Sequence, residues 1–320
     1  MADMERLIAS LAVRPGSMPA GGRPLEELMK TNEILSGAES QRLRTFFSSN
    51  CMEPSRDLDV FGGAVMMGDL DGLKLMHAES VARYRLSSAT DEAARASAAQ
   101  EIYRMRWGPT RVTIYNLVLL CTLINPTRRT QHLQVARWLI DEVKVPVDGV
   151  DLSGSTALHT SISTKPAFDP EYAQMLYDAG GVVTHRNRYG GTPAHEITMI
   201  WDMRNKEVVR KAAAALKWFL EHGGNLDIKD SDGQTARKNV EASKRAVRGM
   251  QLEHWKVVDD EDRRRKRLGD RICTFCGREP RDGMQLLACS RCKTAKYCSP
   301  GPCQKGDWPH HKTVCKPTAV

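Results

Sequence analysis

The chain has 320 residues, of which 41% are hydrophobic and 27% charged, a balance typical of globular proteins with two or three structural units. Its longest apolar stretch, Tyr115 to Ile124, is too short for a membrane span, and the first residues show no secretory signal. We therefore expect a protein of the cytoplasm, the nucleus or both, with no membrane association. The net charge of +8 is uneven, because 20 Lys and Arg stand against 10 Asp and Glu from Arg237 onward.

Residues 1–56 are expected to form an N-terminal helical segment. Apolar residues recur at helical spacing from Met4 to Val13 and again from Pro24 to Leu35. A stretch rich in Pro and Gly separates them and predicts a loop. Neither helix carries a motif that indicates chemistry.

Residues 57–240 contain units that recur. The first, Ala64 to Met76, has the pattern of a helix, a turn of small residues and a second helix. Three later segments open alike, with Gly followed two residues later by Thr: Ser153 to His159, Tyr189 to His195 and Asp232 to Arg237. The first glycines of these openings are 36 and then 43 residues apart.

This pattern resembles the ankyrin repeat, a unit of about 33 residues whose first helix opens with a sequence like Thr-Pro-Leu-His. The resemblance implies a mostly α-helical repeat solenoid, clearest over 112–240, in which stacked helix pairs share one core and present an extended surface to another protein. The wider spacing implies insertions at 165–170 and 200–210, and a longer insertion over 80–109 is expected to be helical around 91–105. A further unit is expected over 112–150. The residues predicted for the shared core are Leu139, Ile140, Leu176, Trp218, Phe219 and Leu220.

His159 and His195, in two of the openings, are interpreted as structural hydrogen-bonding side chains. His195 begins a near match to the metalloprotease motif His-Glu-x-x-His, but Met199 stands where the second imidazole is needed. Cys51 and Cys121 are expected to be small buried side chains. The sequence contains no Walker, Rossmann or hydrolase-elbow motif, so we expect no enzymatic activity.

Residues 241–272 are predicted to form a charged helical linker, beginning with a polar helix from Val240 to Val258. An acidic run over 259–262 then meets a basic run, Arg263 to Arg267. A helix would place opposite charges four residues apart, as in Asp259 with Arg263 and Asp262 with Lys266. The alternative interpretation of the basic run is a nuclear import signal.

Seven of the nine cysteines lie in the last fifty residues, in four ligand pairs: Cys273 with Cys276, Cys289 with Cys292, Cys298 with Cys303, and His311 with Cys315. Eight soft donors make two closed tetrahedral sites with no open position, which indicates two structural Zn²⁺ ions. A segment this short needs such a staple to fold. A disulfide framework or an iron–sulfur cluster is a weaker interpretation, given the odd cysteine count and the histidine.

Residues 273–315 resemble the MYND-type zinc finger, whose pattern is C-x2-C, C-x2-C, Y-C-x3-C-Q and W-x2-H-K-x2-C. One departure is that four residues, not three, separate Cys298 from Cys303. We expect the insert to bulge outward, which keeps Cys303 as a ligand. The resemblance implies interleaved sites, with His310 as the alternative to His311: Cys273, Cys276, Cys298 and Cys303 on one zinc, and Cys289, Cys292, His311 and Cys315 on the other.

The MYND resemblance also implies a ligand, a short proline-containing peptide of the Pro-x-Leu-x-Pro kind that is laid along the finger as an added strand. The matching contact positions are Ser290, Gln304 and Trp308. Trp308 would form an apolar wall and Gln304 a polar clamp. The alternative role for Trp308 is packing of the small core between the metal sites.

These features predict a non-enzymatic adaptor or scaffold for protein–protein interaction, in transcriptional regulation or signalling. The repeats would hold one unidentified protein while the finger holds a proline-rich motif. One alternative is a nucleic-acid-binding zinc protein, which the sparse aromatic residues disfavour. The other is a regulatory subunit of an enzyme complex, because MYND fingers also occur joined to SET methyltransferase domains.

Overall fold

The computed structural model of the protein describes residues 21–163, 167–200, 202–247, 249–280 and 284–317. The helix expected from Met4 to Val13 lies outside these residues. The described part is mostly helical, with one short two-stranded sheet near its end. The predicted fold class, ankyrin-like helix pairs followed by a small finger, is therefore confirmed. The chain divides into two compact units, an N-terminal unit (described residues up to 193, with 229–233) and a C-terminal unit (194–228 and the described residues from 234).

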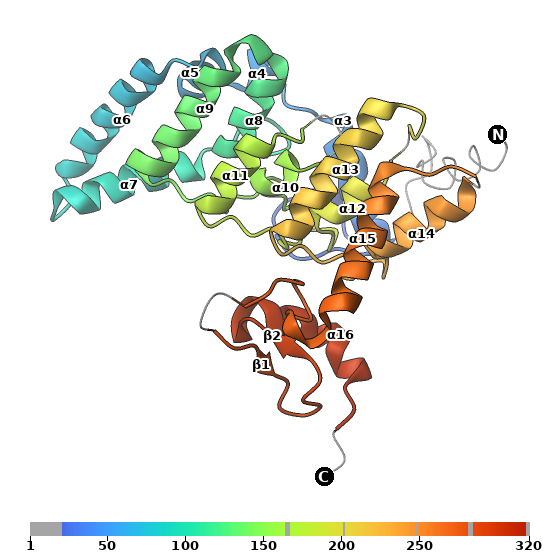
Figure 1. Ribbon diagram of the computed structural model, residues 1–320. Helices are drawn as coiled ribbons and strands as arrows, with labels where there is room; N and C mark the ends of the chain where they lie inside the picture. The colour runs from blue at the N-terminus through green and yellow to red at the C-terminus, as the bar shows by residue number, and fades with distance from the viewer. Residues whose placement is uncertain (1–20, 164–166, 201, 248, 281–283, 318–320) are drawn as a thin grey trace. The chain divides into compact units, whose positions relative to one another are not determined.

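Short and medium helices make up the N-terminal unit (Figure 1). They are α2 (Leu25–Leu28), α3 (Gly37–Ser49), α4 (Pro54–Asp57), α5 (Val60–Met67), α6 (Leu70–Arg85), α7 (Asp91–Arg104), α8 (Ile114–Ile124), η1 (Pro126–Arg128), α9 (Arg129–Trp138) with the π-helical turn η2 (Leu139–Val143), α10 (Ala157–Ser161) and α11 (Pro170–Asp178). Side chains at the N-terminal ends fix several of the starts, as where Asp59, Asp69 and Thr90 accept backbone N–H bonds at the starts of α5, α6 and α7. The helix expected around 91–105 is confirmed as α7.

The repeat openings are turns that hydrogen-bond to one another. In each turn an Asp or Asn side chain accepts backbone N–H groups: Asp151 at the first opening and Asn187 at the second. The N–H of Arg188 then donates to the carbonyl of Ser153 at 2.8 Å, which joins the two turns. Gly154 has a φ of +76°, and a Cβ there would lie 2.9 Å from the nitrogen of Arg188. Glycine is therefore required for the turns to approach this closely.

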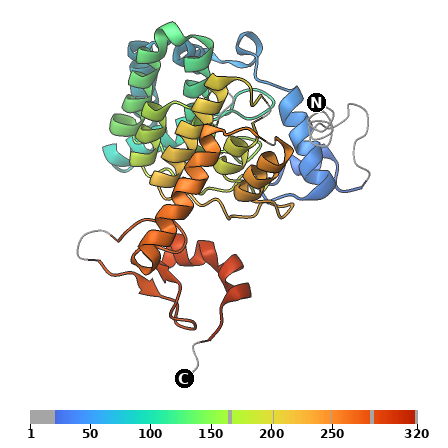
Figure 2. The ribbon, with the colours of Figure 1, turned by 45° about the vertical axis from the view of Figure 1, so that its right-hand side comes forward.

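The C-terminal unit combines three long helices with the finger. Its elements are α12 (Pro193–Thr198), α13 (Lys206–Glu221), α14 (Ala236–Ala246), α15 (Glu253–Leu268), η3 (Gly269–Arg271), β1 (Leu287–Ala288), β2 (Lys296–Tyr297), the π-helical turn η4 (Pro300–Lys305) and α16 (Gly306–Val314). Helix α15 lies along α13 in both views (Figures 1 and 2). The buried stripe of α13 follows helical spacing through Val209, Ala212, Leu216 and Phe219.

The prediction of a single helix from Val240 to Val258 is wrong. Two helices, α14 and α15, cover this stretch, and Gly249 lies between them with a φ of +85°, which a helix cannot continue through. The Nε1 of Trp255 donates to the Ser243 hydroxyl at 3.0 Å and so holds α15 against α14.

The core predictions hold for five of the six residues named. Leu139, Leu176, Trp218, Phe219 and Leu220 are all buried. Ile140 is only half-buried, because it lies in the π-helical turn where the pattern of inward-facing positions shifts. In the described residues, no helix combines the length and the apolar character that crossing a membrane requires.

Candidate metal centres

The eight predicted ligands meet in two clusters within the C-terminal unit. One cluster holds Cys273, Cys276, Cys298 and Cys303, and the other holds Cys289, Cys292, His311 and Cys315. Within each, the ligand atoms all lie within 4.8 Å of one another. These are the two interleaved sets that the sequence resemblance implies, with His311 and not His310 facing the second set.

The distances between donors fit a tetrahedral ion. A zinc ion about 2.3 Å from each sulfur sets the sulfurs about 3.8 Å apart. The sulfurs of Cys276 and Cys298 are 3.7 Å apart, those of Cys289 and Cys315 are 3.9 Å apart, and those of Cys298 and Cys303 are closer, at 3.3 Å. The Nε2 of His311 lies 3.3 Å from the Cys289 sulfur. A disulfide needs about 2.05 Å, and none of the nine cysteines forms one.

Tight turns place the first two ligand pairs. In the first turn the N–H of Gly277 donates to the carbonyl of Cys273 at 2.8 Å, and in the second the N–H of Lys293 donates to the carbonyl of Cys289 at 2.9 Å. Gly277 and Lys293 both adopt positive φ, +67° and +56°, which closes each turn. Hydrogen bonds from the backbone N–H groups of Cys292 and Arg291 lower the pKa of the Cys289 thiol to about 6. That favours the thiolate, the form that binds a metal.

The extra residue between Cys298 and Cys303 is absorbed by a change of helix type. The segment Pro300–Lys305 is a π-helical turn, in which the N–H of Gln304 donates to the carbonyl of Ser299, five residues back, at 3.1 Å. The Ser299 hydroxyl accepts the N–H of Cys303 at 3.3 Å and caps the turn. Cys303 stays buried in the first cluster. The insert therefore widens the helical turn and leaves the ligand in place.

A small core lies between the clusters. Tyr297 is buried, its hydroxyl donates to the Asp307 carboxylate at 2.7 Å, and its ring meets the His311 ring edge-on. Burial and that bond raise the pKa of Tyr297 well above its ordinary value. Tyr297 therefore keeps its proton and fixes α16, which carries His311, against strand β2.

The three predicted peptide-contact residues lie on the outside of the finger. Ser290 is exposed and Gln304 is half-buried. Trp308 is 45% exposed, although its ring also lies 6.2 Å from that of His311. Packing alone does not account for so large an exposed indole. In the described residues, strand β1 pairs only with β2, so its other edge has no strand beside it.

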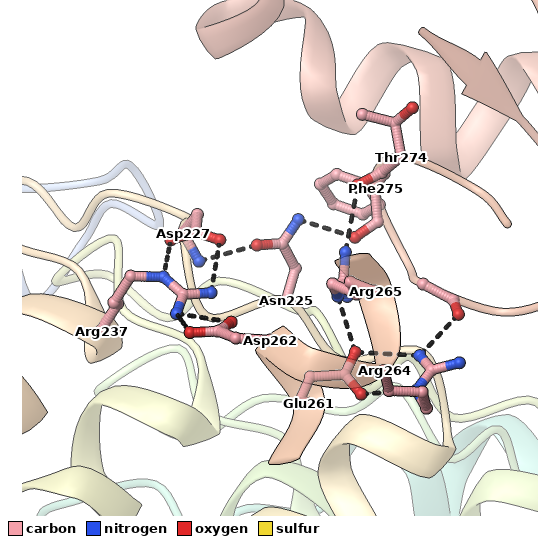
Figure 3. Close-up of polar contacts among 10 residues, drawn as sticks. Asn225, Asp227, Arg237, Glu261, Asp262, Arg264, Arg265, Thr274 and Phe275 are labelled. Atoms are coloured by element: carbon pink, nitrogen blue, oxygen red, sulfur yellow. Dashed lines mark hydrogen bonds and ion pairs between the residues drawn. The ribbon is translucent and has the colours of Figure 1, made fainter. Parts of the chain in front are cut away.

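Helix α15 holds the first metal-binding turn through buried polar groups (Figure 3). Glu261, 8% exposed, accepts hydrogen bonds from both Arg264 and Arg265. Arg264 then donates to the carbonyl of Gly277 at 2.7 Å, and Arg265 to the carbonyl of Thr274 at 3.2 Å. Gly277 has a φ of +67°, which favours glycine, and a Cβ there would displace the Arg265 guanidinium, 2.5 Å away.

A second contact joins this turn to the segment that follows α13. Asn225, which follows α13, donates to the carbonyl of Phe275. Nearby, Arg237 bridges Asp227 and Asp262 (Figure 3). The turn of residues 274–278, together with Asn225, Glu261, Arg264 and Arg265, is called the knuckle clamp below.

The expected ion pairs of the linker are replaced by others. Asp259 pairs with Lys244 of α14, not with Arg263, and Asp262 pairs with Arg237, not with Lys266. The linker helix packs against neighbouring helices, so these two residues find partners outside it, whereas Asp260 pairs with Arg263, and Glu261 with Arg264 and Arg265, within the helix. Sequence reasoning missed Asn225 and Glu261, because neither belongs to a motif and the groups they orient are backbone carbonyls.

The structure also places the two histidines and two cysteines that the sequence analysis named outside the finger. His195 is buried, with its Nε2 3.3 Å from the carbonyl of Gln234, and His159 is also buried. Cys121 is buried, as predicted. The prediction for Cys51 is wrong, because this residue lies exposed in the short loop between α3 and α4.

A model of the MYND finger family matches residues 273–315. This segment is therefore a MYND-type zinc finger. Two curated relatives match it: SET domain and MYND-type zinc finger protein 6 of Schizosaccharomyces pombe, 46% identical over 46 residues, and human histone-lysine N-methyltransferase SMYD3, 47% identical over 47 residues. Each match covers 14% of this chain, and only 9% and 10% of the respective relatives.

Solved structures similar to the chain are helical. One is an ankyrin repeat domain from Acinetobacter baumannii AYE, with a TM-score of 0.35 and 16% identity, covering 62% of this chain and 96% of that one. Another comes from the complex of a predatory endopeptidase with an immunity protein from Bdellovibrio bacteriovorus, with a TM-score of 0.31 and 17% identity, covering 64% and 99%. At these scores neither likeness carries an inference about function.

Proposed function

We propose that the protein is a non-enzymatic adaptor whose finger binds a proline-containing peptide of the Pro-x-Leu-x-Pro kind. The observation that carries this proposal is the 45% exposed Trp308, with Gln304 four residues before it. Gln304 and Trp308 share a helical face, since side chains four residues apart are neighbours. Within the described residues the outer edge of β1 has no neighbouring strand, so its backbone groups could pair with an added strand.

In this proposal the metal ions are two structural Zn²⁺ ions. Four protein donors around each ion leave no position for a substrate or a water. Bound zinc would hold the two tight turns and α16 in fixed relation, which a finger with so small a core needs to fold. Free thiols at all nine cysteines suit a reducing compartment, and so the cytoplasm or the nucleus.

The repeats would supply the second half of an adaptor by binding another protein through the surface that their helices and turns present. Tethering two weak binding sites in one chain raises the overall affinity for a partner that carries both targets. A role in transcriptional regulation or signalling fits such a two-site scaffold.

Fluorescence anisotropy of a labelled Pro-x-Leu-x-Pro peptide with the zinc-loaded full chain tests the proposal. Trp308→Ala is expected to weaken binding about tenfold or more, as the loss of an aromatic anchor does. Val314→Ala is the matched control, because Val314 is an exposed apolar residue on the same helix. Both variants should keep two zinc ions per chain. Equal binding by the parent and Trp308→Ala would refute the proposed site.

A further inference from the structure

The exposed face around Trp308 is basic. Residues 284–317 hold six Lys and Arg but a single acidic residue, Asp307. Asp307 is buried and its carboxylate accepts the Tyr297 hydroxyl, so it does not present its charge on the surface. Lys296 is paired with Asp270. Residues 284–317 therefore carry more positive than negative charge.

Two lysines flank Trp308 on its own helical face. Lys305 lies three residues before it and Lys312 four residues after it, spacings that place all three on one side of the helix. Both lysines are exposed, and within the described residues neither forms an ion pair. Elsewhere in this unit, Arg237 and Lys244 do have acidic partners. The lysines beside the indole are thus available to a ligand.

The second cluster does not cancel this charge. One zinc ion with three thiolates and a neutral imidazole would carry a net charge of about −1. Those three sulfurs belong to buried residues, whereas the lysine side chains reach into solvent. The exposed ammonium groups of Lys305 and Lys312 therefore set the charge that an approaching peptide meets beside Trp308.

We propose that the finger selects proline-containing peptides in which acidic residues flank the apolar anchor. This inference rests on the proposed function and adds the chemistry of the flanks. Lys305 and Lys312 are seven residues apart, about 10 Å along a helix. An extended peptide rises about 3.3 Å per residue, so acidic residues on either side of a five-residue core lie about 20 Å apart, and the two long lysine side chains would reach outward to meet them.

Three peptides with one Pro-x-Leu-x-Pro core and Glu, Gln or Lys flanks test this inference with the zinc-loaded full chain. At low salt the Glu peptide should bind about three- to tenfold more tightly than the Gln peptide, the gain expected of two exposed ion pairs. The gain should shrink toward nothing near 1 M salt, where the screening length is about 3 Å. The Lys peptide should bind more weakly than the Gln peptide.

Reversing the charge of the two lysines is the second part of the test. The double variant Lys305→Glu/Lys312→Glu should invert the order and favour the Lys peptide. Lys256→Glu, an exposed lysine on α15, is the matched control and should leave the order unchanged. Zinc content and helical circular dichroism establish that both variants fold.

Each outcome decides between the two proposals. If the Gln and Glu peptides bind equally, the flank inference is wrong and the proposed function stands. If none of the peptides binds the parent chain, both are wrong. If a DNA duplex binds more tightly than every peptide, with a steep salt dependence that the double variant abolishes, the basic face serves nucleic acid and the flank inference is overturned.

Discussion

The side-chain amide of Asn225 donates a hydrogen bond to the backbone carbonyl of Phe275 at 2.8 Å, across 50 positions of sequence. Both residues are buried, at 7% and 5% exposure. Asn225 closes the repeat that opens at Tyr189, and Phe275 lies between the first two metal ligands. The bond therefore ties the repeat directly to a metal-binding turn.

Replacing Asn225 with Ala should loosen this turn. The variant leaves a buried carbonyl unpaired, which costs about 1–3 kcal/mol. Hydrogen exchange over residues 273–278 should become faster, and the unfolding temperature should fall. Asn239→Ala is the control, because the Asn239 side chain donates a long bond of 3.5 Å to Thr198. Unchanged exchange over 273–278 would show that the Asn225 bond contributes little.

Replacing Glu261 with Gln should have an effect of similar size. Burial raises the pKa of Glu261, but hydrogen bonds from Arg264 and Arg265 outweigh it and lower the pKa below its ordinary value. Gln cannot accept the same charged bonds, so about 2 kcal/mol of stability should be lost, as for a broken, partly buried ion pair. Glu241→Gln, at an exposed position of α14, should change the unfolding midpoint in denaturant very little. Equal unfolding midpoints for Glu261→Gln and Glu241→Gln would show that Glu261 does not stabilise the knuckle clamp.

The same substitution tests the basic run as an import signal. Arg264 and Arg265 are held by Glu261 and by the metal-binding turn, which competes with an import receptor for their guanidinium groups. A fluorescent fusion of the Glu261→Gln chain should therefore become more nuclear than the parent if the run is a signal. The Glu241→Gln fusion provides the matched baseline, and identical distributions would argue against the signal.

Zinc stoichiometry tests the ligand assignment. The parent chain should bind two zinc ions, and Cys289→Ser should bind one, because this change removes a donor from the second cluster only. Cys51→Ser replaces an exposed cysteine in the N-terminal unit and should still bind two. Mass spectrometry under native conditions counts the ions. A Cys289→Ser chain that retains two ions would exclude Cys289 as an essential ligand.

His254 should make the protein less stable in mild acid. It is fully buried in α15, and neither ring nitrogen has a hydrogen-bond partner in the described part of the chain. Burial, assisted by Lys244, lowers its pKa from 6.5 to about 4. Between these values the unfolded chain binds the extra proton and the folded chain does not, so stability falls as the pH drops. The loss could reach about 3 kcal/mol below pH 4.

Comparison with His254→Leu isolates that effect, because titration of the metal ligands is common to both chains. The free energy of unfolding, measured by denaturant from pH 7 to pH 4, should fall more steeply in the parent. The two should be close at pH 7, where the imidazole is neutral and an apolar residue of similar size suits the site. Parallel curves would mean that His254 titrates normally.

The metal centres could be predicted because their signal is local. Pairs of Cys separated by two residues encode their own turns, so the ligands of 273–315 follow from spacing and a family pattern. The repeat openings could be predicted for the same reason, since Gly154 and Thr156 each meet a local backbone requirement.

The knuckle clamp could not be predicted in the same way. Its acceptors are the carbonyls of Thr274, Phe275 and Gly277, and a carbonyl has the same chemistry at every residue. The charge pattern of 259–267 suggested pairs within one helix. Tertiary packing of α15 against α13 and α14 offered Lys244 and Arg237 as partners, which sequence spacing does not reveal.

A shortened protein ending before Cys273 would not be a clean separation of modules. The deletion would expose Ile228, which packs against the core of the finger, and would leave Asn225 without its hydrogen-bond acceptor. Arg264 and Arg265 would lose the carbonyls to which they donate. Any phenotype of such a deletion would combine damage to the preceding helices with loss of peptide binding. Substitutions of exposed residues such as Trp308 leave the fold of both parts intact.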